Sequence, residues 1–188
     1  MSDTFNINNV KTLINDATTM EVSDISKIIV KMVDIKNDIN RIKQKKTQAY
    51  TIDDKIILNC FSNNLQHKIK KCFIDSYNIV EDAIEDIGNL EASIRSDLYD
   101  YYWETYIDVL TDFHIDIENE QCIKGHSDKI YNRIIEIISA QIFNNRQSDI
   151  ETNKKITYLN SITAYVFYEC KILIPIETSK RSGTLDKT

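Results

Sequence analysis

The sequence predicts an all-α fold, a single-domain bundle of roughly five to seven helices with one long central hairpin. Three observations lead to this prediction. The chain of 188 residues contains only three glycines and one proline, whereas a β-sandwich or barrel needs turn residues about every 8–12 positions. Apolar side chains recur every three or four positions, as they do on one face of a helix. Hydrophobic residues make up 42% of the chain, which is enough for one core.

Isoleucine is the residue type that argues against helices. It occurs 33 times against nine leucines, and its branched Cβ favours strands. The spacing of these isoleucines is nevertheless helical. The excess of Ile, Asn, Lys, Asp and Tyr over Ala and Gly suggests an A/T-rich gene, a hypothesis that its base composition would test. Small, acidic helical proteins are common among viruses and mobile elements, but the sequence carries no motif of a family that we recognise.

The first long helix is expected to begin at Ser23 or Asp24, after a short helix over residues 8–17. Its apolar residues follow a 4-3-4-3 spacing, the seam of a coiled-coil-like helix: Ile28, Met32, Ile35, Ile39 and Ile42. Because this seam holds for only about three heptads, we interpret it as one helix of an intramolecular bundle. A homodimer through the Ile28–Ile42 helix is the alternative.

The next helical region is expected from residue 52 to Gly88. Thr51 and Asp54 resemble a capping box with Asp in place of Glu. Apolar spacing continues through residues 52–87 without an obvious break, so one helix or two both fit, with a bend at Asn63-Asn64 or Ser76. After Gly88, helical spacing resumes and continues to about Phe113.

The C-terminal third is expected to hold a loop and two helices. Residues 113–125 alternate briefly with period two and end in Gly125, which predicts the major loop. Ser127-Asp128 would cap the next helix, and a capping box at Ser148–Glu151 would open the last one, which Pro175 would end. Residues 1–176 would form the bundle domain, and the polar residues 177–188 a disordered tail.

Charge is unevenly distributed along the chain, whose net charge is −6. Residues 81–120 contain thirteen acids and one base, Arg95, which gives a local charge of −12. Residues 36–71 contain nine bases and three acids, which gives +6. Two interpretations stay open: the two stretches pair internally in the bundle, or the acidic stretch is a binding face.

The acidic stretch also holds the richest aromatic segment, residues 97–106, with four tyrosines and the only tryptophan. Aromatic side chains with a polar tip are favoured interface anchors, and carboxylates accelerate encounter with a basic partner. The candidate partner-binding residues are Asp97, Tyr99, Asp100, Tyr101, Trp103 and Glu104. Basic runs at residues 41–46 and 67–71 are short in an acidic chain, so nucleic acid is not the expected partner.

No catalytic motif is present, and the three glycines are too far apart for a phosphate-binding loop. The residues that come nearest to a metal-ligand set lie in the predicted loop over residues 114–126: His114, Asp116, Glu118 and His126. Their spacing matches no closed zinc pattern and lacks the glycine of a calcium loop, so a polar surface loop explains them better. No cofactor and no catalytic residue are assigned.

These observations favour a non-enzymatic interaction protein of the inhibitor, immunity or adaptor type, which binds a basic partner protein through the acidic, aromatic helix. A helical enzyme with a metal-assisted site in the 114–126 loop and a self-associating structural protein are the alternatives. Four separated cysteines without a secretory segment suggest thiols in a reducing compartment, so we expect a cytoplasmic location. No apolar run approaches the roughly 20 residues that span a membrane, so no membrane insertion is expected.

Overall fold

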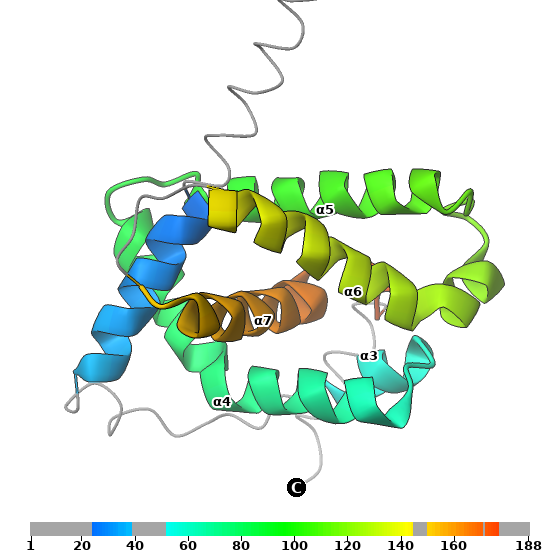
Figure 1. Ribbon diagram of the computed structural model, residues 1–188, viewed down its shortest axis with the longest axis horizontal. Helices are drawn as coiled ribbons and strands as arrows, with labels where there is room; N and C mark the ends of the chain where they lie inside the picture. The colour runs from blue at the N-terminus through cyan, green and yellow to red at the C-terminus, as the bar shows by residue number, and fades with distance from the viewer. Residues whose placement is uncertain (1–23, 39–51, 145–149, 171, 177–188) are drawn as a thin grey trace, which may run out of the picture.

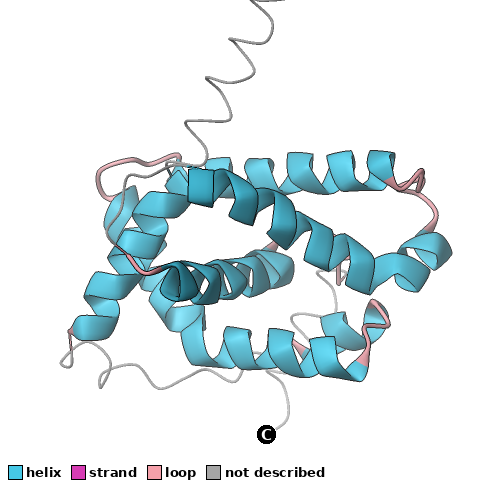
Figure 2. Cartoon of the chain, in the orientation of Figure 1, coloured by secondary structure: helices cyan, strands magenta, loops and turns pink. Residues whose placement is uncertain are grey.

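Six helices make up most of the chain in the computed structural model, which describes residues 24–38, 52–144, 150–170 and 172–176 (Figures 1 and 2). Within these residues there is no strand, so the all-α prediction is confirmed. The helices comprise residues 24–37, α3 (Asp53–Leu58), α4 (Asn63–Gly88), α5 (Ile94–Asp112), α6 (Glu120–Asn144) and α7 (Thr152–Glu169).

Helix α7 is the centre of the bundle. Its residues 158–167 are all buried, on every side of the helix. It packs against α4 and α6, and Figure 1 shows it enclosed between α4 on one side and the pair of α5 and α6 on the other. Helices α5 and α6 are joined by residues 113–119 and pack along each other as a long hairpin. The core of the domain therefore surrounds α7, the last helix among the described residues.

The helix at residues 24–37 covers the core as one helix of the bundle. Ile28, Met32 and Ile35, which form the described half of the predicted seam, are all buried within the single chain. Ile39 and Ile42 lie outside the described residues, as do the predicted helix at residues 8–17 and the tail at residues 177–188. In the part of the seam that the structure describes, the apolar face is used by the bundle itself.

Residues 52–87 form two helices, which answers a question that the sequence left open. The break lies at residues 59–62, directly before Asn63. Cys60 has φ 54°, in the left-handed region that a continuing helix cannot use. The buried Asn59 side chain accepts a hydrogen bond from the Ile174 N–H (2.9 Å) and donates one to the Ile174 carbonyl (3.0 Å). This long-range contact holds the chain where α3 ends.

Helix α6 begins earlier than predicted, so the expected loop over residues 113–125 is too long and the expected cap at Ser127-Asp128 is wrong. The cap is Asn119, whose Oδ1 accepts a hydrogen bond from the Cys122 N–H (3.0 Å). Ser127 lies inside α6 and donates to the Ile123 carbonyl (2.9 Å). Asp128 accepts a hydrogen bond from the Ser62 N–H (3.0 Å), so it serves the start of α4 instead.

Helix α7 also differs from its prediction at both ends. It begins at Thr152, with Glu151 at the N-cap position and no side-chain cap hydrogen bond, and residues 148–149 lie outside the described part. It ends at Glu169, well before Pro175. The end is fixed by the fully buried Lys55, whose ammonium donates to the carbonyls of Phe167 and Cys170, the latter at 2.7 Å. A cation at a helix C-terminus satisfies carbonyls that lack helical partners.

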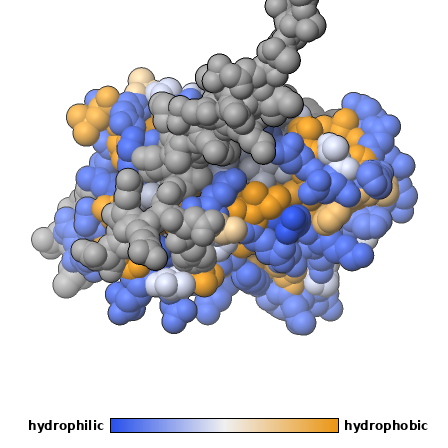
Figure 3. Space-filling view, turned by 45° about the horizontal axis from the view of Figure 1, so that its top comes forward, coloured by the Kyte–Doolittle hydropathy of each residue, from blue (hydrophilic) through white to orange (hydrophobic). Residues whose placement is uncertain are grey.

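In the view of Figure 3, hydrophilic residues cover most of the coloured surface, and apolar residues gather in a few separate patches. Among the described helices, none has both the length and the apolar character required to cross a membrane.

Candidate functional site

Helix α5 carries the acidic, aromatic segment, and it divides that segment between two faces. The inner face contributes the buried side chains of the helix, which are Ile94, Leu98, Tyr101, Tyr102, Thr105, Tyr106, Val109 and Leu110. The outer face is exposed at Asp100, Glu104, Asp108 and Asp112. The aromatic content of the segment therefore belongs mainly to the core, and its carboxylates belong to the surface.

The four exposed carboxylates form one stripe, because they follow each other at intervals of four residues. We call Asp100, Glu104, Asp108 and Asp112 the α5 acidic stripe. Within the described part of the chain, none of the four takes part in an ion pair or a side-chain hydrogen bond. The stripe thus presents uncompensated negative charge along about three turns of one helix.

This arrangement is unfavourable for α5 itself. Like charges four residues apart destabilise a helix by about 0.2–0.5 kcal/mol per pair. Asp112 is the last residue of the helix, and no basic residue lies in the last turn, although the negative end of the helix dipole favours cations there. Neither charge pattern contributes to folding, so the stripe needs another explanation.

The other predicted partner-binding residues have mixed positions. Asp97 and Trp103 are half-buried, and the Trp103 ring lies 5.8 Å from that of Tyr106. Tyr99 is half-buried, with its hydroxyl 3.3 Å from that of Tyr165. Tyr101 is buried and donates a hydrogen bond to Gln141, so its ring is not part of the surface. Asp97, Asp100, Trp103 and Glu104 remain available to a partner.

Part of the acidic stretch is paired with lysines of the same chain at the surface. The Lys27 ammonium lies 2.9 Å from a carboxylate oxygen of Glu91, and that of Lys31 lies 3.2 Å from Asp86. Both lysines belong to the helix at residues 24–37. Lys27 and Lys31 precede the basic stretch at residues 36–71, so these pairs do not test the predicted pairing of the two stretches. They do show that the acidic stretch has both paired and exposed carboxylates.

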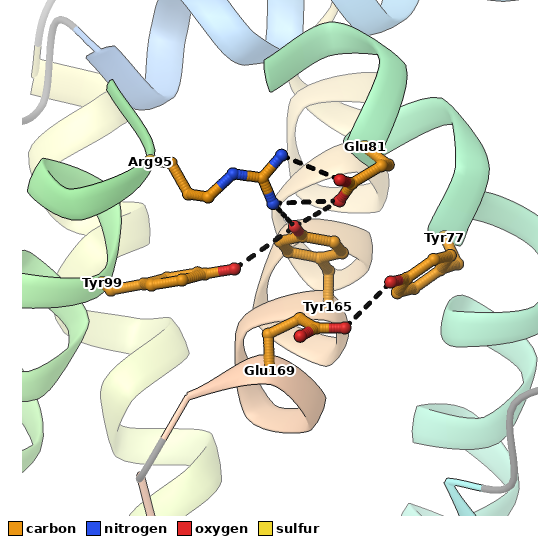
Figure 4. A network of polar contacts seen from close by, with 6 residues as sticks. All are labelled: Tyr77, Glu81, Arg95, Tyr99, Tyr165 and Glu169. Atoms are coloured by element: carbon orange, nitrogen blue, oxygen red, sulfur yellow. Dashed lines mark hydrogen bonds and ion pairs between the residues drawn. The ribbon is translucent and has the colours of Figure 1, made fainter. Parts of the chain in front are cut away.

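Behind α5 lies a polar cluster that joins it to α4 and α7 (Figure 4). The Arg95 guanidinium binds both carboxylate oxygens of Glu81, at 2.8 and 3.1 Å, and its Nη1 donates to the Tyr165 hydroxyl at 2.5 Å. Tyr165 in turn donates to Glu81. Next to it, the Tyr77 hydroxyl donates to Glu169 at 2.8 Å. We call Glu81, Arg95 and Tyr165 the Arg95 clamp.

The protonation of the clamp is fixed by its geometry. Hydrogen bonding to Glu81 raises the pKa of Arg95 above its ordinary value. Burial, and then the hydrogen bond to Glu81, raise the pKa of Tyr165. A permanently charged guanidinium and a neutral phenol bind each other and the same carboxylate, which suits a structural contact rather than proton transfer.

The clamp was not predicted from the sequence, although one signal could have found it. Arg95 is the only base among thirteen acids in residues 81–120, and a lone cation in such a stretch is a natural partner for a nearby carboxylate. Its partners Glu81 and Tyr165 lie on other helices, and no spacing rule connects them.

The predicted metal ligands do not gather into a site. Within the described residues, no group of three or more His, Cys, Asp or Glu side chains could hold a metal ion. Asp116 accepts a hydrogen bond from the Glu118 N–H (3.0 Å), which shapes the turn. His114 lies in the turn after α5 with φ 54°, whereas the Nδ1 of His126, inside α6, lies 2.9 Å from the Cys122 carbonyl oxygen.

In comparisons with protein families, curated proteins and solved structures, nothing matches this chain. Its function has to be inferred from its own geometry and charge.

Proposed function

We propose that this protein is a non-enzymatic binding factor, of the inhibitor, immunity or adaptor type, which recognises a basic partner protein through the α5 acidic stripe. The observation that carries the proposal is the stripe itself, with four exposed carboxylates at four-residue intervals that form no ion pair among the described residues. Departures from local stability rules are expected mainly at functional sites.

A basic partner would make the charge of the stripe favourable, whereas in the free protein the carboxylates repel one another. Lysine or arginine side chains placed along the helix would turn the repulsion between like charges into attraction. A focused negative field would also accelerate association, and salt would weaken that effect. The half-buried Trp103, next to Glu104, provides an aromatic anchor of the kind that dominates many interfaces.

The Arg95 clamp supports this function indirectly. It attaches the first turns of α5 to α4 and α7 through side chains that are bound to one another. A recognition helix held in this way loses little conformational freedom on binding, which favours affinity.

The proposal can be tested with a displayed library of random peptides, selected on the immobilised full-length chain. We expect the enriched peptides to carry net positive charge. Their affinity should fall about tenfold or more on the triple variant Asp100→Lys, Glu104→Lys, Asp108→Lys, because close charge pairs at an interface contribute at least ~1.5 kcal/mol.

The matched control is the triple variant Asp75→Lys, Glu85→Lys, Glu136→Lys, which changes the net charge by the same amount at three exposed positions on α4 and α6. This variant should bind the selected peptides nearly as well as the original chain. Enrichment of neutral or acidic peptides, or equal losses in the two variants, would contradict the proposal.

A further inference from the structure

A groove lies near the end of α7, beside Trp103 and Tyr106 of α5. It consists of two open hollows, with volumes of about 460 and 210 Å³, which meet at Glu120, Ile174 and Pro175. We call it the Pro175 groove. Trp103 of α5 lines the smaller hollow, and Leu58 of α3 lines the larger one. The groove thus joins the loop end of the α5–α6 hairpin to the short helix α3.

The floor of the groove is rigidly supported. The Asn59 amide binds both the N–H and the carbonyl of Ile174, and Lys55 binds the carbonyl of Cys170. Between these contacts Leu173 has φ 58°, a left-handed conformation that leucine rarely adopts and that costs about 1–2 kcal/mol. The surrounding hydrogen bonds therefore hold this segment in one shape before any ligand binds.

The rim of the groove combines exposed apolar side chains with carboxylates. Ile57 is 67% exposed and Ile117 is 39% exposed, which is unusual for isoleucine beside a hollow. Asp54, Glu118 and Glu120 are exposed around them. Among the described lining residues there is no lysine or arginine. Glu120 is paired with Lys124 of α6 at 3.4 Å, whereas Asp54 and Glu118 form no ion pair among the described residues. The rim therefore offers apolar contact beside two unpaired carboxylates.

We propose that the Pro175 groove receives two leucine or isoleucine side chains, one in each hollow, from a partner segment that carries lysine or arginine on both sides of them. This inference rests on the proposed function and deepens it, since the groove adjoins α5 at Trp103. One apolar side chain contacts Ile57 in the larger hollow and the other contacts Ile117 in the smaller one. The flanking cations lie against Asp54, Glu118 and the stripe. Charge complementarity selects this occupant over a purely apolar one.

Trp103 makes the groove directly observable, because it is the only tryptophan in the chain. The probes are three short synthetic peptides: one in which lysines flank two leucines, one with glycines in place of the leucines, and one with glutamates in place of the lysines. We expect the lysine–leucine peptide to shift Trp103 emission to shorter wavelength, and the other two peptides to bind about tenfold more weakly or worse.

The decisive variant is Ile57→Ser, Ile117→Ser, and its matched control is Ile74→Ser, Leu90→Ser. Ile74 and Leu90 are 51% and 88% exposed and do not line the groove. Because all four side chains are exposed, both variants should fold, which circular dichroism verifies. The groove variant should bind the lysine–leucine peptide about tenfold more weakly, and the control variant should bind it unchanged.

The other outcomes separate the two proposals. If the groove variant binds like its control while the stripe reversal at Asp100, Glu104 and Asp108 abolishes binding, the groove assignment is wrong and the proposed function stands. If neither variant changes binding, both are wrong. Equal binding of the glutamate–leucine peptide would overturn the basic partner. A solution mass that doubles with concentration, and does so only when Ile57 and Ile117 are intact, would identify a second copy as the occupant and overturn the proposal as well.

Discussion

Helices α5 and α7 have nearly equal lengths, 19 and 18 residues, and opposite relations to solvent. Helix α7 is buried on every side over residues 158–167, whereas α5 buries one face and exposes carboxylates on the other. Both helices are rich in tyrosine, but α5 contains five acidic residues and α7 only one. The acidic residues of α5 are mostly on its exposed face.

The buried hydroxyl groups at the contacts of α7 have partners, whereas the buried Oδ1 of Asn160 has none among the described residues. Tyr102 lies 2.9 Å from Thr163, hydroxyl to hydroxyl, and the Ser161 hydroxyl donates to that of Ser76 at 3.0 Å. The carboxylates of the α5 stripe have no such partners among the described residues. The difference teaches that polar side chains in this protein have two uses. Those at the contacts of α7 stabilise the fold, whereas the carboxylates on the outer face of α5 oppose the helix and are exposed.

The largest expected loss of stability comes from removing a large buried side chain of α7. The Phe167 ring contacts those of Phe61 and Tyr131, with centroids 5.5 and 5.9 Å away, and the Lys55 ammonium lies 4.7 Å from its centre. Phe167→Ala should lower the free energy of unfolding by about 3–5 kcal/mol. Urea denaturation followed by circular dichroism measures it.

A substitution on α5 should lower the free energy of unfolding less than the substitution on α7. Ile107 is half-buried on α5, so Ile107→Ala should lower the free energy of unfolding by less than half as much. If the two substitutions have equal effects, the distinction between the helices does not hold.

High pH should lower the free energy of unfolding, because buried tyrosines resist ionisation. Burial raises the pKa of Tyr102 and of Tyr131 above the ordinary value of 10.0. The folded chain therefore keeps these protons where the unfolded chain loses them, so their contribution to stability is complete below about pH 10 and declines above it. Each tyrosine contributes about 1.4 kcal/mol per pH unit to this change. The two tyrosines together should therefore lower the free energy of unfolding by roughly 3 kcal/mol at pH 11.

Denaturation at pH 8 and pH 11 measures this loss, and Tyr102→Phe is the control. This variant should show a smaller decrease, because one of the two shifted groups is gone. A free energy of unfolding that stays constant up to pH 11 would show that these phenols are not buried as described.

A smaller loss of stability is expected when the Arg95 clamp, which joins α5 to α7, is disrupted. Arg95→Met removes the guanidinium that binds Glu81 and Tyr165, and it should lower the free energy of unfolding by about 1–2 kcal/mol, since hydrogen bonds to charged groups are stronger than average but the pair is partly exposed. Tyr165→Phe should have an effect of similar size. The double variant should lose less free energy of unfolding than the two single variants lose together, because the three side chains act as one unit. Additive losses would mean that the clamp does not exist.

The sequence was sufficient for the fold class because helical periodicity survives wherever one face is buried. Ile130, Ile134, Ile138 and Ile142 of α6 are all buried, as their spacing predicts. The helix ends were harder to predict, because long-range contacts set them. Lys55 ends α7, and Asn59 holds the residues that follow it. No local sequence pattern predicts either contact.

The candidate site was predictable only in part. The acidic character of residues 97–106 is visible in the sequence, and so is the four-residue spacing of the stripe. The tyrosines were misleading, since Tyr101 packs inside and Tyr99 points to Tyr165. Aromatic rings serve cores and interfaces equally well, so only the fold could divide them. The Pro175 groove is assembled from α3, α5, the start of α6 with the residues before it, and residues 173–176, and no sequence window contains it.

The most direct test measures stability and binding on one variant, Asp100→Asn, Glu104→Gln, Asp108→Asn. This substitution removes the charge of the stripe with little change in size. We expect the free energy of unfolding to stay the same or to rise by up to about 1 kcal/mol, because repulsion along α5 is relieved, while affinity for the lysine–leucine peptide falls about tenfold. A variant that unfolds more easily than the original chain, or that binds the peptide equally well, would contradict the claim that these carboxylates serve recognition rather than folding.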